Sequence, residues 1–421
     1  MKIAKYISIE LYVLLLFIIF DLIQFLFIIN TRIFIGDFFP DFVTVSNYVI
    51  INLFLVYMLF SFLTFIFYTN FLRRVKIINK KIFYDSKTSK FVDKFYFVLL
   101  ILNFLVFVLI LNKKAGAEYT PHKFTFLLNM FKLDVIFSLY YFLNRSSNKL
   151  YLLNVIGTVL VMIAQGWVGI LFKVFIYELF FRFRNRINIF KIIPLTILIF
   201  VAAILAYSVI YPIKNAIRYG YESIFIFDPL PLSQAAFLIF GRLSMFSNLV
   251  AIYQYSDNFV NLLNSFFPPY FEILRFFRVI TPSFIAIKLF PESINYGKGY
   301  ILWSFHTNFS GEGVYGFGST LMGTLYLLFN KDILEAVLYI LAIFIIIIYL
   351  KCLLDLLNNK ILYFLFFLNL LHFVRESGEI WLSFSNMVVS WTLFILVIII
   401  YKNFRSLKVY QSIVKEMNKG K

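Results

Sequence analysis

The side chains best suited to chemistry lie in one polar stretch, from Tyr211 to Gly318, between two long apolar regions. Its basic residues are Lys214, Arg218, Arg242, Arg275, Arg278, Lys288 and Lys298. Guanidinium groups keep their charge and offer paired N–H donors, so arginines beside lipid suit a phosphate or pyrophosphate group. The stretch also holds seven of the ten prolines, which argues against one continuous membrane helix. These residue types therefore predict a region that binds an anion.

Three basic clusters within this stretch are candidates for holding the anion. Lys214 and Arg218 are four residues apart, so on a helix they share one face and repel each other unless an anion joins them. Arg242 stands alone in an apolar run, where an unpaired guanidinium is costly. The third cluster comprises Arg275, Arg278 and Lys288. Each cluster could instead anchor a helix at the membrane surface, with the charged ends reaching into water.

Candidates for acid–base work are few. Glu312 lies in a glycine-rich segment, Gly311 to Ser319, where backbone amides can approach a ligand closely. Its carboxylate could act as a general base, and His306 is a weaker candidate for the same role. A loop with a capping glutamate would fit the same pattern, so both interpretations stay open.

Further charges stand in or beside other apolar runs. Arg375 has Glu376 and Glu379 next to it, so it could close the anion site or pair locally with these carboxylates. Four charged residues within apolar runs of the first half form two candidate pairs, Lys132 with Asp134 and Lys173 with Glu178. Charges in lipid are costly unless they are paired, so we interpret these four as interhelical pairs that fix packing.

Several enzyme classes lack their signatures in this chain. It has no phosphate-binding Walker loop, no nucleophile elbow, no zinc-protease motif and no acidic pair for a metal-bound nucleotide sugar. The three histidines, His122, His306 and His372, are far apart, and Cys352 is the single cysteine. The sequence therefore predicts no metal site, no cofactor and no intramolecular disulfide.

The rest of the chain has the composition of membrane helices. It is 62% hydrophobic with a mean hydropathy of +0.88, and apolar runs of about 20 residues recur, which predicts an all-α polytopic membrane protein. The net charge of +18 lies mostly in short loops beside these runs, so the positive-inside rule explains it better than nucleic-acid binding. The predicted spans are 7–29, 45–70, 95–111, 124–143, 150–167, 169–183, 192–210, 333–350, 361–374 and 380–401.

The spans divide the chain into three parts. A membrane bundle over 1–210 precedes the polar loop over 211–330, and membrane helices with a basic tail occupy 331–421. Two apolar pieces in and after the loop, 233–252 and 314–329, must both span or both not span, which gives twelve crossings or ten. Their glycines and Arg242 favour surface or re-entrant helices and thus ten crossings. Both termini then lie inside, while the polar loop and Arg375 lie outside.

The order of these features resembles the Wzy-type O-antigen and oligosaccharide repeat-unit polymerases. Arg278-Val279-Ile280-Thr281-Pro282, followed by Lys288-Leu289-Phe290-Pro291, is similar to that family's segment of prolines, arginine and lysine. The segment Gly311–Ser319, which runs into Gly323-Thr324-Leu325-Tyr326, is similar to its glycine-, serine- and tyrosine-containing element before the last helices. An arginine between the last two helices, here Arg375, also fits.

The resemblance implies a GT-C-like glycosyltransferase at the periplasmic face of a bacterial inner membrane. It would transfer the growing glycan from undecaprenyl pyrophosphate to a hydroxyl of a new lipid-linked repeat unit. The implied catalytic residues are Glu312, His306 and Arg242. The implied residues that bind substrate or pyrophosphate are Lys214, Arg218, Arg275, Arg278, Lys288 and Arg375.

The resemblance also implies partners. These are the undecaprenyl-pyrophosphate-linked oligosaccharide, membrane lipid, and a chain-length regulator and flippase of the same pathway. Two other functions stay open. An O-antigen ligase shares the architecture and differs in its acceptor. A lipid-linked oligosaccharide flippase would be expected to show more regular helices and no large outer loop.

Overall fold

The computed structural model describes most of the chain. The described residues are 6–38, 41–78, 84–111, 128, 130–145, 148–167, 169–183, 187–219, 229–281, 283–291, 293, 318–357, 359–377 and 379–419. Within these ranges, some helices are described by their backbone without all of their side chains.

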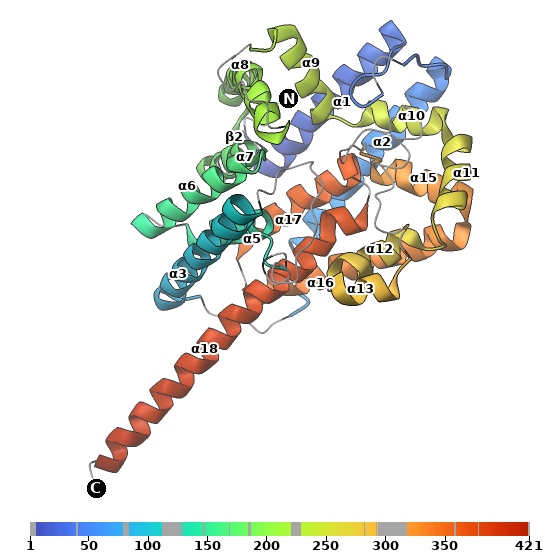
Figure 1. Ribbon diagram of the computed structural model, residues 1–421. Coiled ribbons are helices and arrows are strands. Elements are labelled where there is room, and N and C mark those ends of the chain that lie inside the picture. Colours follow the sequence, from blue (N-terminus) through green and yellow to red (C-terminus); the bar gives the residue numbers. More distant parts are fainter. Residues whose placement is uncertain are drawn as a thin grey trace.

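Helices make up nearly all of the described chain (Figure 1). In the first half they are α1 (Ile9–Thr31), α2 (Asn47–Phe67) with its π-helical end η1 (Tyr68–Leu72), α3 (Ser86–Asn103) with η2 (Phe104–Ile110), α5 (Leu133–Asn144), α6 (Lys149–Ala164), α7 (Gly169–Phe183) and α8 (Ile189–Tyr219). In the second half they are α9 (Leu232–Leu243), α10 (Phe246–Gln254), α11 (Ser256–Phe266), α12 (Phe271–Ile280), α13 (Ser283–Leu289), α15 (Leu321–Lys331), α16 (Ile333–Leu357), α17 (Lys360–His372), η5 (Phe373–Ser377), η6 (Trp381–Ser385) and α18 (Asn386–Lys419). Strands β1 (Tyr6–Ile7) and β2 (Ile187–Asn188) form a short antiparallel pair. The predicted all-α class is confirmed.

Six helical segments in the described ranges are long and apolar enough to cross a membrane, so the chain is a polytopic membrane protein. They are Ile9–Thr31, Asn47–Leu72, Ser86–Ile110, Thr196–Ile213, Ile333–Leu357 and Ser383–Leu407. The predicted count of ten or twelve is not reached, and it stays a prediction. Part of the expected fourth span, 124–143, falls outside the described residues, and helices such as α5 and α6 are shorter than a full span.

The two ambiguous apolar pieces form short helices. In the first piece, α9 and α10 meet at a bend of 66° between Gly241 and Phe246, and counting this bent pair as one span would raise the number to seven. In the second piece, α15 has 11 residues, fewer than the roughly 20 that a membrane span requires. Surface or re-entrant helices were expected in both places, and broken, short helices fit that expectation.

Charged residues of the first half pair across helices. Lys173 of α7 lies 3.9 Å from Asp134 of α5, and Glu178 of α7 pairs at 2.8 Å with Arg145, which caps α5. The Tyr141 hydroxyl also donates to Glu178. Interhelical pairing is thus confirmed for three of the four predicted residues, but the partners differ from the predicted ones, since Lys173 pairs with Asp134 and Glu178 pairs with Arg145.

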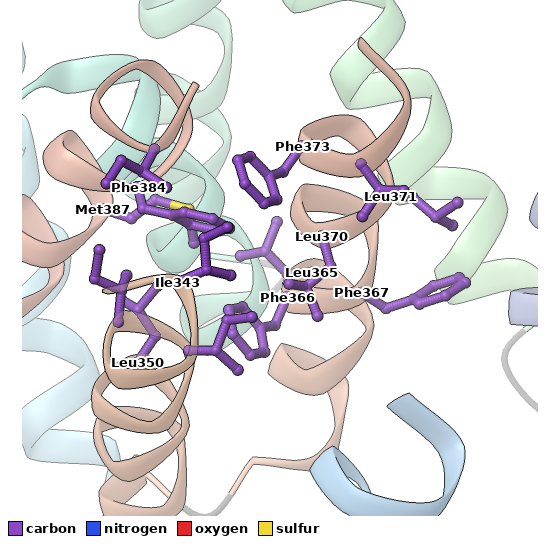
Figure 2. Packing of buried hydrophobic residues seen from close by; sticks show 14 of the residues in the cluster. Ile343, Leu350, Leu365, Phe366, Phe367, Leu370, Leu371, Phe373, Phe384 and Met387 are labelled. Carbon is purple, nitrogen blue, oxygen red and sulfur yellow. The ribbon is translucent and has the colours of Figure 1, made fainter. Parts of the chain in front are cut away.

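The helices of the polar loop, α9 to α13, curve around one side of the molecule, and α3, α5 and α6 stand on the other (Figure 1). Between them α17 is buried on nearly all sides, which is typical of a helix at the centre of a bundle. Figure 2 shows its Phe366 and Leu370 packed toward Ile343 of α16, with Phe384 of η6 above them. This packing fixes the short turn η5 in the interior.

Candidate functional site

A buried ion pair joins η5 to the middle of α1. Nη2 of Arg375 donates to Oδ1 of Asp21, and the two side chains are 1% and 0% exposed. The same nitrogen lies 3.3 Å from the carbonyl oxygen of Phe17, and the guanidinium sits 4.2 Å from the centre of the Phe17 ring. Charges inside a membrane bundle are costly and mark functional sites more often than other buried groups do. This pair is therefore the centre of the candidate site.

Local structure explains how Arg375 reaches this position. α17 has 13 residues, and its helix continues without a break into η5, which ends at Ser377. Arg375 lies in the π-helical segment η5, which is followed by a second one, η6, and π-helical segments recur at functional sites. The Tyr57 hydroxyl of α2 donates to the carbonyl oxygen of Arg375 at 3.0 Å, which fixes η5 against α2.

This placement corrects one expectation from the sequence. Arg375 was expected in a loop, where it would close an anion site or pair locally with Glu376 or Glu379, but its side chain is buried and its ion-pair partner is Asp21. Counting membrane crossings could not show that the Arg375 side chain is buried against α1.

The guanidinium of Arg375 is only partly bonded. Its Nε and Nη1 atoms have no hydrogen-bond partner in the part of the chain that the structure describes. A buried donor without a partner costs about 1–3 kcal/mol, and more when it is charged. The arrangement is therefore suited to an anion or ordered water that completes these bonds.

The bend between α9 and α10 forms one wall of the site. Gln24, one turn after Asp21 on α1, donates to the carbonyl oxygens of Phe240 and Ser244 at 3.0 and 2.8 Å. Its own side-chain oxygen accepts from the Ser247 amide at 3.0 Å. These bonds hold the bend against α1, so the helical backbone at Arg242 lies close to the ion pair. Only the backbone of Arg242 is described.

Glycines let these segments pack closely. Gly241 lies against Gly36, where a Cβ on Gly241 would be 3.0 Å from the Gly36 Cα. Gly36 has a φ of +89°, a conformation that favours glycine. The loop before α2 is thereby fixed to the bend.

The segment before α15 forms the opposite wall. Asn248 of α10 donates to Oδ2 of Asp37 at 2.8 Å and to the carbonyl oxygen of Gly318 at 3.0 Å. A Cβ on Gly318 would overlap the carbonyl oxygen of Glu376 in η5. Gly318 was expected to bring backbone toward a ligand. Its closest neighbour is instead the backbone that carries Arg375.

The third basic cluster lies on α12 and α13. Arg275 of α12 is buried with its guanidinium 3.8 Å from the ring centre of Trp381 in η6. Burial lowers the pKa of Arg275 to about 10, although Glu379 and Glu272 act against this shift. Burial also lowers the pKa of the half-buried Arg278, and Lys288 is exposed. The contact between Arg275 and Trp381 joins α12 to η6 and so supports η5 from outside.

The remaining predicted residues are placed incompletely. Glu312 and His306 lie outside the described residues. Lys214 and Arg218 lie near the end of α8, where the structure describes only their backbone. The structure therefore brings together Arg375 and the backbone of Arg242, and it leaves the proposed bases untested. Within the described ranges, no group of three or more His, Cys, Asp or Glu residues could hold a metal ion.

Sequence reasoning missed Asp21. It is a carboxylate ten residues before the end of a 23-residue apolar helix. A lone acid in the middle of an apolar span needs a partner, and this signal could have identified it. What the sequence could not supply was the partner, because Asp21 and Arg375 are 354 residues apart.

The fold and the site define a polytopic all-α membrane protein with a charged centre inside its bundle. No family model, curated protein or solved structure matches the chain. Function must therefore be argued from the site itself.

Proposed function

We propose that this protein is a polyprenol-dependent glycosyltransferase that polymerises undecaprenyl-pyrophosphate-linked oligosaccharide repeat units. The observation that supports this most is the buried Arg375, whose Nε and Nη1 have no hydrogen-bond partner among the described residues. In this reaction a lipid pyrophosphate leaves, and it must be stabilised where its negative charge develops. Two guanidinium donors held in a dry interior meet that requirement.

Asp21 acts in this proposal as a positioning residue. Its carboxylate holds Nη2 of Arg375, so the other two guanidinium nitrogens keep a fixed direction. Arg242, on the bend beside the pair, would add the second positive charge that a pyrophosphate requires. Glu312 or His306 would take the proton from the acceptor hydroxyl, which attacks the anomeric carbon as the bond to pyrophosphate breaks.

The position of the ion pair suits a lipid-borne substrate. A polyprenyl chain stays in the hydrocarbon, so its pyrophosphate must meet a charged group at the depth of the bundle or at its edge. Asp21 and Tyr57, which contact Arg375, both lie within apolar membrane-length helices. We place the protein in a bacterial inner membrane with a GT-C-like arrangement of ten spans, a periplasmic loop over 211–330 and both termini cytoplasmic.

The test uses a cell that lacks the gene and is complemented with variants. Deletion is expected to leave lipopolysaccharide cores that carry a single repeat unit. Cores without any attached unit would point to a ligase or a flippase instead. Arg375→Lys keeps a charge for Asp21 but loses Nε and the fork of donors, so it is expected to reach the membrane and to produce no long ladder.

The matched control is Arg145→Lys. Arg145 also pairs with a carboxylate, but at the surface of the bundle, with 37% of its side chain exposed. This variant should retain the full ladder. A normal ladder from Arg375→Lys at wild-type protein levels would overturn the assignment of the site.

A further inference from the structure

A polar pocket lies between α11 and α15, separate from the ion pair. Its volume is about 330 Å³. The lining residues are Asp257, Val260, Asn261, Tyr326 and Asn330.

The sequence builds this pocket from two helix faces. Asp257, Val260 and Asn261 have the spacing that places side chains on one face of α11, and α11 buries Phe259 and Leu263 on its other side. Tyr326 and Asn330 are four residues apart on α15, so they also share a face. Tyr253 packs against the Tyr326 ring at a centroid distance of 5.4 Å and holds it in place.

The lining has the chemistry of a saccharide site. A sugar ring presents hydroxyls, which both donate and accept hydrogen bonds, and a face of C–H groups. Asparagine amides donate and accept, a carboxylate accepts, and a tyrosine ring offers a flat apolar surface. The pocket has one or more groups of each kind. Few precisely placed polar groups beside an aromatic ring are typical of small-molecule sites.

Other ligands fit this lining less well. No lysine or arginine is among the described residues that line the pocket, and the carboxylate of Asp257 would repel a phosphate. A calcium ion takes six to eight oxygen ligands, usually with several carboxylates, and the described lining has one carboxylate.

α15 connects the pocket to the proposed active site. Its first turn is capped by Thr320, whose Oγ1 accepts from the Gly323 amide at 3.0 Å, and Gly318 just before it packs on η5. From Leu321 to Tyr326 the helix rises by about 8 Å. The pocket therefore lies on the same short helix whose preceding segment packs on η5.

We infer that this pocket binds one sugar unit of the lipid-linked glycan while the pyrophosphate contacts Arg375. The inference rests on the proposed function for the identity of the glycan. The recognition of a sugar ring rests on the pocket alone. Because two exposed amides and one tyrosine make a weak site, the pocket selects and orients a unit of a longer chain, and the lipid anchor supplies most of the affinity.

The experiment measures saturation-transfer NMR on the purified full-length protein in detergent. The probes are free glucose, galactose, mannose and N-acetylglucosamine at millimolar concentration. Sorbitol serves as a probe with similar hydroxyls and no ring. At least one sugar is expected to receive more saturation than sorbitol. Tyr326→Ala and Asn261→Ala should each weaken that binding about tenfold.

The matched control is Asn258→Ala. Asn258 is exposed on the same helix but does not line the pocket, so its replacement should leave the signal unchanged. The inference is overturned if no sugar exceeds sorbitol, or if both pocket variants bind as the wild type does.

The outcomes separate this inference from the proposed function. Sugar binding that depends on Tyr326, together with normal polymer in the deleted cell, would support the pocket and refute the polymerase. Loss of polymer in Arg375→Lys, together with unchanged sugar binding in both pocket variants, would support the polymerase and refute the pocket.

Discussion

Two ion pairs in this bundle are equally buried and differ in how many of their polar atoms have hydrogen-bond partners. Arg375 and Asp21 join η5 to α1, while Lys351 and Asp355 lie four residues apart on α16. The side chains of both pairs are at most 1% exposed. Burial alone therefore does not distinguish a structural pair from a functional one.

Each polar side-chain atom of the pair on α16 has a hydrogen-bond partner. Oδ1 of Asp355 accepts from Lys351 and from the Tyr363 hydroxyl of α17, and Oδ2 accepts from the Ile77 amide at 2.8 Å. The Lys351 ammonium also lies 4.8 Å from the centre of the Tyr363 ring. This pair joins α16, α17 and the segment after η1, and its bonds leave no evident place for a ligand.

The pair at η5 is different because Nε and Nη1 of Arg375 remain unbonded in the described chain. Folding tolerates an incomplete charged group when function requires it, and such exceptions are the ones to explain first. We therefore expect Lys351 to stabilise the fold and Arg375 to act in the proposed reaction. The predictions below test that division.

The largest effect on stability is expected from Lys351→Met. It leaves the Asp355 carboxylate buried without its cation, which should lower the free energy of unfolding by about 3–5 kcal/mol. The double variant Lys351→Met/Asp355→Leu removes both charges and should recover most of that loss. Thermal unfolding of the purified protein in detergent measures both. Equal instability of the single and double variants would contradict a simple ion pair.

The largest effect on activity is expected from the double variant Asp21→Asn/Arg375→Gln. It removes both charges from the other pair and keeps groups of similar size, so the melting temperature should change little. Polymer synthesis should fall about 100-fold or more, the usual effect of removing a donor that stabilises developing charge. Retained synthesis in this variant would make the pair at η5 structural, like the pair on α16.

Features of the fold and the site could be predicted from the sequence where the residues involved are close together in the chain. The apolar runs from Ile9 to Thr31 and from Ile333 to Leu357 predict membrane helices because hydropathy is a local property. Lys351 and Asp355 have the spacing of a helical pair and needed no tertiary information. The contact between Asp21 and Arg375 depends on the packing of helices at opposite ends of the chain, which no local pattern specifies.

The bend between α9 and α10 and the geometry of η5 could not be predicted from the sequence either. Gly241 and Arg242 indicated a break, but the bonds of Gln24 that hold this break against α1 join residues more than 200 positions apart. The π-helical geometry of η5 was not predicted either, since the polar residues from Arg375 to Ser377 indicated only the end of an apolar span. The sequence singled out Arg375 by its type, but it could not supply the buried contact with Asp21.

A moderate effect is expected from Gly318→Ala. The added methyl group would overlap the carbonyl oxygen of Glu376, and backbone on both sides leaves no flexible side chain to move away. Crowding of this kind costs about 1–3 kcal/mol, and here it should displace η5 and reduce polymer length. Gly169→Ala is the control, because nothing lies within 4 Å of the added Cβ. Normal polymer from Gly318→Ala would show that the position of η5 is not critical.

The smallest effect on stability is expected at an ion pair on the surface, between Asp85 and Arg405. Asp85 caps α3 by accepting from the Thr88 amide at 2.8 Å, and it pairs with Arg405 of α18, with about a third of each side chain exposed. The hydrogen bonds from Thr88, together with Arg405, hold the pKa of Asp85 well below its usual range. Asp85→Ala should lower stability by about 1 kcal/mol at neutral pH through loss of the cap.

The pH dependence of stability tests the ionic part of the contribution of Asp85. Because the folded pKa of Asp85 is lowered, its ionic contribution is present above the ordinary carboxyl pKa and is lost as the pH falls toward the folded value. The gap in melting temperature between wild type and Asp85→Ala should therefore narrow below about pH 4. Asp85→Asn keeps a good cap and should show only the part of the gap that comes from charge. A gap that stays constant with pH would mean that the charge on Asp85 adds nothing to the cap.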